Sequence, residues 1–186
     1  PLNSNANNFA FRKKIFRELQ GYGDAAAVVS GDDDLLLQRI AASRRRIHYM
    51  IDPQGTVRTA PTGTLRGVIE QRKRWSSKTV YYYHRQRLFL SGIFLFYCLL
   101  PGAAALGFLD QRFAFALGGM LAVKVIGEAA VMVPGLHISA TQRLWPFFLP
   151  ASLITPVVII YSVLSGVFGT FRWKGEQYAR RVGGSS

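Results

Sequence analysis

The chain has very little cysteine and histidine; the first shortage excludes a disulfide-held scaffold, and the second argues against a histidine metal site. Cys98 is the only cysteine in 186 residues, so a fold held together by internal disulfides is excluded. The three histidines are far apart and lack metal-ligand spacing, so the sequence does not indicate a histidine metal site. Acids are also scarce, with 10 Asp and Glu against 23 Lys and Arg. The resulting net charge of +13 permits contact with nucleic acid or with anionic lipid.

Charge is missing altogether from long stretches of the second half, and this pattern predicts a membrane protein. Leu88–Leu109 has no charged residue, and about 20 apolar residues suffice for a helix to cross a bilayer. A second run, Phe113–Leu136, holds only Lys124 and Glu128, which are four apart and therefore share one helical face. We expect them to form a structural pair. The alternative is a polar contact with a lipid-linked substrate or with a partner helix.

A third run, Leu144–Phe171, is uncharged but contains three prolines. We expect its start, "LWPFFLP", to be interfacial and its span to cover about residues 152–169. Cations cluster ahead of the first run, which predicts that the front half is cytoplasmic. Three complete spans would then place the cations after residue 171 outside, against the same rule. Either the cluster of cations before the first run determines the orientation, or one run is re-entrant and does not cross the membrane.

Three adjacent acids in "SGDDDLLLQRI", Ser30 to Ile40, raise the question of why a basic chain gathers them. A helix beginning here gains from a cap and from acids in its first turn. Capping explains one or two of them, because successive helical residues point about 100° apart and like charges repel. An aspartate that faces a cleft and acts as a base explains another. On this stretch alone, capping is favoured.

The segment "QRKRW", Gln71 to Trp75, is the second motif that carries chemistry. A guanidinium binds phosphate through two hydrogen bonds, and an indole ring can stack on a sugar. In a helix, Gln71, Arg74 and Trp75 share a face, and we expect Arg72 and Lys73 to point toward lipid headgroups. The alternative is an ordinary basic amphipathic helix on a membrane surface. Elsewhere, the pattern predicts a helix within residues 7–23 that stops at a glycine, and a short strand at 46–52.

In this order, followed by apolar runs, these motifs resemble the membrane-bound family 2 glycosyltransferases, which include the cellulose and hyaluronan synthases. That family has a Thr-Glu-Asp motif and, some tens of residues later, Q-x-x-R-W. Asp32 matches the aspartate, whereas Ser30 and Gly31 depart from the first two positions, and residues 71–75 match Q-x-x-R-W fully. Asp34 matches an aspartate that often follows. The ending "FRWKGEQY" is similar to the close of many members.

The resemblance implies an α/β remnant of a GT-A (nucleotide-diphospho-sugar transferase-like) domain in residues 1–87. A mostly α-helical transmembrane region of two to three helices would follow at 88–171, and a basic tail at 172–186. It also implies inverting transfer from a nucleotide-sugar donor to a saccharide or lipid-linked acceptor. The reaction would take place at the cytoplasmic face of a bacterial inner (plasma) membrane. Nucleic acid is not an expected partner, because the basic cluster adjoins the apolar runs.

By the same resemblance, Asp32 is the base that deprotonates the acceptor. Gln71 and Arg74 hold the acceptor end or the donor diphosphate, and Trp75 stacks on the acceptor sugar. The supporting residues that the resemblance implies are Asp34, Asn8 and Arg12. The family binds Mg²⁺ or Mn²⁺ through a D-x-D motif, which does not occur here outside "DDD". We therefore expect a fragment without its own metal site, inactive alone. The alternative is a non-catalytic membrane anchor or subunit with a basic segment that binds anionic lipid.

Overall fold

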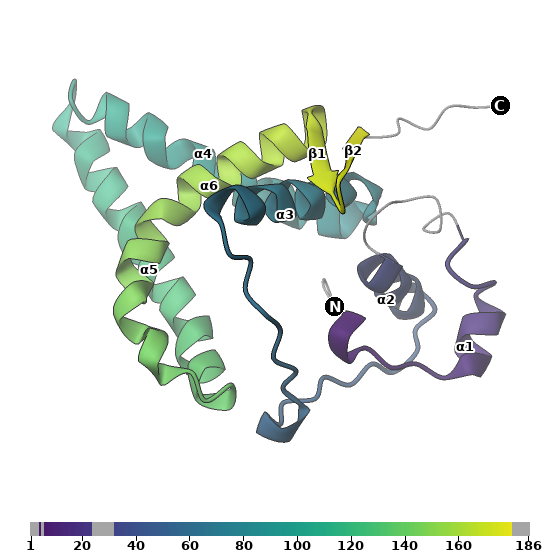
Figure 1. Ribbon diagram of the computed structural model, residues 1–186. Helices are drawn as coiled ribbons and strands as arrows, with labels where there is room; N and C mark the ends of the chain where they lie inside the picture. Colours follow the sequence, from purple (N-terminus) through teal and green to yellow (C-terminus); the bar gives the residue numbers. More distant parts are fainter. Residues whose placement is uncertain (1–3, 5, 24–31, 180–186) are drawn as a thin grey trace. The chain divides into compact units, whose positions relative to one another are not determined.

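The structure is a computed structural model that describes residues 4, 6–23 and 32–179 (Figure 1). Ser30, Gly31, Arg180 and Arg181 of the motifs and cation clusters above lie outside the described residues. Within the described part, the chain is mostly helical, and its sheet is a two-stranded antiparallel hairpin. The elements are η1 Ala6–Asn8, α1 Lys13–Glu18, α2 Asp32–Ala42, η3 Pro53–Gly55, α3 Leu65–Ser77, η4 Lys78–Tyr81, α4 His84–Leu106, α5 Gln111–Ile138, η5 Gln142–Phe147, α6 Phe148–Phe168, β1 Thr170–Trp173 and β2 Glu176–Ala179.

The chain divides into two compact units. The first unit comprises Pro1–Met50, Gly55–Phe89 and Ser162–Ser186, and the second comprises Ile51–Gln54 and Leu90–Tyr161. The first unit therefore joins the front of the chain to its end, and it contains both sequence motifs. The second unit contains most of the apolar sequence.

Helix α2 supplies much of the buried core of the first unit. Its three acids occupy the first turn, where carboxylates interact favourably with the helix dipole. The leucines that follow, Leu35, Leu36 and Leu37, are buried, as is Ile40. The predicted helix after the acids is confirmed. Helix α1 is shorter than the predicted one, and the chain turns at Gly21, whose φ of 71° suits glycine.

The strand predicted at residues 46–52 is wrong. These residues form neither helix nor strand, and Tyr49, Met50 and Ile51 are exposed. Their apolar and β-branched composition suits a strand. However, a strand also needs a neighbouring strand to complete its backbone hydrogen bonds, and none of the described segments pairs with this one.

Helix α3 carries "QRKRW" and begins at a regular cap, where the Thr64 hydroxyl accepts a hydrogen bond of 3.1 Å from the N–H of Gly67. The hairpin β1–β2 packs on this helix (Figure 1). Its two-residue turn, Lys174–Gly175, has positive φ at both positions, as the common tight hairpin turn requires. The segment was expected to be a basic tail, and its sequence pattern did not predict a hairpin.

The predicted region of long apolar helices is confirmed. Helices α4, α5 and α6, the last extended by η5, are long and apolar enough to cross a membrane. In the second unit, the ammonium of Lys124 lies 2.8 Å from Glu128 Oε2 and 2.8 Å from Ser152 Oγ. The hydroxyl of Tyr97 donates to the other carboxylate oxygen of Glu128 at 3.2 Å. Since side chains of α4 and α6 satisfy this pair, the contacts favour the structural interpretation of Lys124 and Glu128.

Candidate functional site

The three acids of α2 have different surroundings, as their helical spacing predicts. Asp32 is the first residue of the helix and is exposed. The side chain of Asp33 is 16% exposed and that of Asp34 only 1%. Asp34 is therefore a buried carboxylate, and a group of this kind is stable only when charged or hydrogen-bonded partners surround it.

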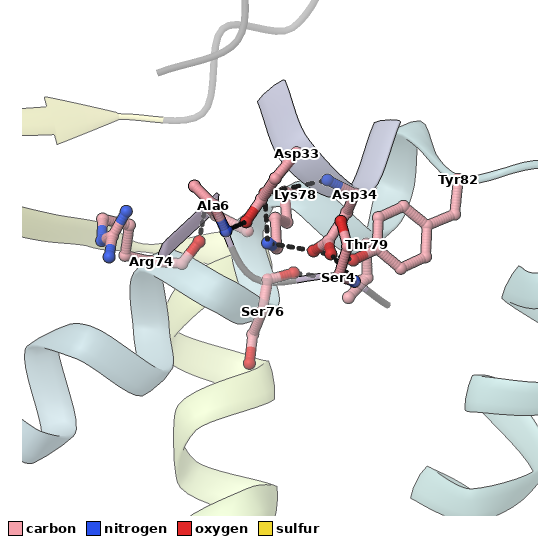
Figure 2. A network of polar contacts seen from close by, with 10 residues as sticks. Ser4, Ala6, Asp33, Asp34, Arg74, Ser76, Lys78, Thr79 and Tyr82 are labelled. Carbon is pink, nitrogen blue, oxygen red and sulfur yellow. Dashed lines mark hydrogen bonds and ion pairs between the residues drawn. The ribbon is translucent and has the colours of Figure 1, made fainter. Parts of the chain in front are cut away.

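Asp34 has such partners from two other parts of the chain (Figure 2). It accepts 2.8 Å hydrogen bonds from the Ser4 N–H and from the Tyr82 hydroxyl, and it forms an ion pair with Lys78. Asp33 accepts from the Ala6 N–H at 3.0 Å, and its Oδ1 lies 3.9 Å from the Lys78 ammonium. The ammonium thus lies between the two carboxylates. We call Asp33, Asp34, Lys78 and Tyr82 the anchor cluster.

Tyr82 acts as a neutral donor in this cluster. Burial raises the pKa of Tyr82 well above its ordinary value, and the negative charge of Asp34 and the hydrogen bond to it raise the pKa further. The hydroxyl therefore stays protonated and donates a hydrogen bond to the carboxylate. Lys78 and Tyr82 were not identified from the sequence. The signal available was that both residues follow "QRKRW" within a few turns, Lys78 as the C-cap of α3 and Tyr82 as the C-cap of η4.

The residues of "QRKRW" do not divide into faces as predicted. Trp75 is 39% exposed, and the Arg72 guanidinium lies 5.4 Å from its ring centre. Lys73 was expected to point toward headgroups, but its side chain is only 13% exposed and forms a 3.1 Å ion pair with Glu70. That expectation is wrong, because this side of α3 contacts the hairpin, whose position was not predicted from the sequence.

Arg74 and the first two acids of α2 lie close enough to interact electrostatically. Burial lowers the pKa of Arg74, while the charges of Asp33 and Asp32 act in the opposite direction. The guanidinium also lies 5.2 Å from the ring centre of Trp173 on β1. Arg74 is thus half-buried and is influenced by the charges of the α2 acids, and Gln71 lies half-buried one turn earlier on the same helix.

The two supporting residues at the start of the chain occupy other surroundings. The Asn8 side chain donates a 2.6 Å hydrogen bond to the carbonyl of Gly55. Arg12 is exposed at the N-cap of α1, where its side chain makes no capping hydrogen bond. Asn8 therefore holds a loop, and the third supporting residue, Asp34, belongs to the anchor cluster.

The acids of the described residues do not fit a metal ion. No group of three or more His, Cys, Asp or Glu side chains in the described ranges could hold one. Asp33 and Asp34 face the Lys78 ammonium, which already supplies the positive charge that a metal would bring.

The contact between α3 and the hairpin is expected to weaken in acid. Burial raises the pKa of Glu70, but the Arg172 N–H and the Lys73 ammonium outweigh this effect, so the pKa lies below its ordinary 4.5. A lowered pKa means that the carboxylate stabilises the fold above pH 4.5, and that this contribution is lost as the pH falls through the lowered value. At pH 7, Glu70→Gln should destabilise the protein by about 0.5–1 kcal/mol, since solvent screens the charge of this carboxylate. In denaturant unfolding, this difference should shrink below pH 4, and an equal difference at both pH values would contradict the assignment.

Comparison with protein-family models, with curated proteins and with solved structures finds no match to this chain.

Proposed function

We propose that the chain is the C-terminal part of a membrane-bound glycosyltransferase of the family 2 type. It would transfer a sugar, with inversion, from a nucleotide-sugar to a saccharide or lipid-linked acceptor at the cytoplasmic face. The observation that carries the proposal is the ion pair of Asp34 on α2 with Lys78, the C-cap residue of the helix that carries "QRKRW", since it joins the two sequence motifs within one unit. Helices α2 and α3 would then be the last elements of a GT-A domain. The donor-binding half and its D-x-D metal site would belong to preceding sequence.

The proposed chemistry needs a base, an anion-binding group and a sugar platform. A carboxylate of α2 takes the proton of the acceptor hydroxyl, whose oxygen then bonds to the anomeric carbon as the bond to the nucleoside diphosphate breaks. Asp32 suits this role because it is the exposed acid of the three and thus accessible to an acceptor. Arg74 would compensate the charge of the departing diphosphate.

Trp75 suits the role of sugar platform because its ring is partly exposed on α3. In the full-length protein, Trp75→Ala should lower transfer by about 10²-fold, since a misplaced acceptor reacts slowly. Arg74→Lys should also lower transfer, because an ammonium cannot reproduce the two parallel hydrogen bonds of a guanidinium. The measurement is sugar transfer from nucleotide-sugars in detergent, at matched amounts of folded protein. The control is Arg66→Gln, which removes an exposed cation from the first turn of the same helix.

The second candidate is a non-catalytic membrane anchor. The exposed Trp75, with the Arg72 guanidinium over its ring, is the observation that favours it, because aromatic and basic side chains together suit a membrane interface. Normal transfer by both Trp75→Ala and Arg74→Lys would contradict the catalytic roles and favour the anchor. Loss of transfer in both, with Arg66→Gln unaffected, would support the enzyme.

A further inference from the structure

We propose that the C-terminal hairpin β1–β2 is part of the site, and that Trp173 is a positioning residue that sets the plane of the Arg74 guanidinium. The hairpin then lies on the same side of the membrane as α3. The catalytic part of this inference rests on the proposed function, whereas the placement of the hairpin does not.

The hairpin has a defined conformation of its own. Its register pairs Phe171 with Tyr178, whose rings stack with centres 5.7 Å apart, and Phe171 is buried. The turn is closed by Trp173 and Glu176, which face each other across Lys174–Gly175. A two-residue turn fixes the register of a hairpin. The position of Trp173 on β1 is therefore set by the pairing.

The attachment of this end of the chain to α3 is specific. The N–H of Arg172 donates a 2.7 Å hydrogen bond to Glu70, whose other oxygen pairs with Lys73. At Gly166, near the end of α6, an added Cβ would lie 2.4 Å from the carbonyl oxygen of Lys73. Only glycine permits so close an approach of α6 to α3. Two independent contacts thus hold the C-terminal segment on the helix that carries "QRKRW".

In this position, the guanidinium carbon of Arg74 lies over the indole ring of Trp173, 5.2 Å from the ring centre. The ammonium of Lys174 lies 4.8 Å from the same ring centre. A planar guanidinium that stacks on an indole loses much of its freedom to rotate. Recognition of a phosphate through two parallel hydrogen bonds requires a fixed guanidinium plane. Trp173 therefore acts through Arg74, on the residue that we assign to the diphosphate.

The contact also constrains the path of the chain through the membrane. Helix α3 precedes the first apolar helix, and the hairpin follows the third. Because α3 and the hairpin touch, the chain between them crosses the bilayer an even number of times, so one apolar helix is re-entrant or interfacial. Arg172 and Lys174 then lie on the same side as the cations of α3, as the positive-inside rule requires.

Placement is tested without any activity measurement. In full-length protein with Cys98→Ser, single cysteines at Thr59 and at Glu176 are labelled with a membrane-impermeant maleimide, in intact and in permeabilised cells. We expect both positions to be protected in intact cells and labelled after permeabilisation. Labelling of Glu176→Cys alone in intact cells would overturn the proposal, whether or not the protein transfers sugar.

The positioning role is tested by kcat and KM for the nucleotide-sugar. We expect Trp173→Ala to lower kcat/KM by about 10-fold, and Trp173→Phe, which keeps an aromatic face, to restore most of it. The matched control is Trp145→Ala, a tryptophan of η5 that stacks on Phe148. In a protein that already carries Arg74→Lys, Trp173→Ala should lower kcat/KM only slightly further, because both changes affect the same interaction.

If the double variant loses kcat/KM by the product of the two single losses, the positioning role is overturned. Equal losses of kcat/KM in Trp173→Ala and Trp173→Phe would overturn it too. Wild-type kinetics in Trp173→Ala would overturn it as well, while leaving the proposed function intact. A wild-type protein that transfers no sugar from any nucleotide-sugar would overturn the proposed function and the positioning role together. The labelling result would still decide where the hairpin lies.

Discussion

Asp32→Asn in the full-length protein should lower sugar transfer by about 10²–10⁴-fold, because removal of a general base costs this much in rate. Folding should remain near normal. Asp32 is exposed at the first position of α2, and asparagine keeps most of the ability of aspartate to satisfy a helix N-terminus. The measurement is the rate of transfer at matched amounts of folded protein, with the midpoint of denaturant unfolding as the check on folding.

Asp33→Asn is the matched comparison for this prediction. Asp33 is the neighbouring carboxylate, and it accepts hydrogen bonds from the backbone N–H groups of Ala6 and Asp34. Asparagine retains one acceptor oxygen, so we expect a loss below about 10-fold. If Asp33→Asn abolishes transfer while Asp32→Asn does not, Asp33 is the base. If both variants transfer normally, the acids of α2 serve only to cap and anchor the helix.

Lys78→Met should give the largest loss of stability in the first unit, about 3–5 kcal/mol. The change removes the cation between Asp33 and Asp34, and it leaves the buried carboxylate of Asp34 without a counter-charge. The double variant Lys78→Met with Asp34→Asn should recover part of the loss, since it removes the uncompensated charge. The measurement is the free energy of unfolding in denaturant, for the full-length protein in detergent.

Arg45→Gln is the control for the ion pair of Lys78. Arg45 and Glu18 form a 2.9 Å pair in the same unit, but both side chains are exposed. Exposed pairs contribute about 0–1 kcal/mol, so this change should alter the free energy of unfolding very little. A Lys78→Met protein that is as stable as Arg45→Gln would mean that Asp34 is not held as a buried ion pair.

The local sequence pattern was sufficient to predict several helices. An uncharged run from Leu88 to Leu109 can satisfy its backbone in a membrane only as a helix, and α4 covers most of it. Acids before a leucine run predicted α2, because the helix dipole and the buried leucines act within a few turns. The stop of α1 near Gly21 also follows from a local conformational preference. Each of these elements depends on neighbours in the sequence.

Contacts between segments that are distant in the sequence decided which side chains are buried and which charges pair. The sequence by itself determined that α2 begins with three acids and that α3 carries "QRKRW". Only the tertiary structure decided which acid is buried, because the partners of Asp34 are Ser4, Lys78 and Tyr82. In the same way, Arg74 meets Trp173 through a hairpin that begins after the last apolar helix. Composition and periodicity describe one segment at a time, whereas burial and charge pairing depend on which segments pack together.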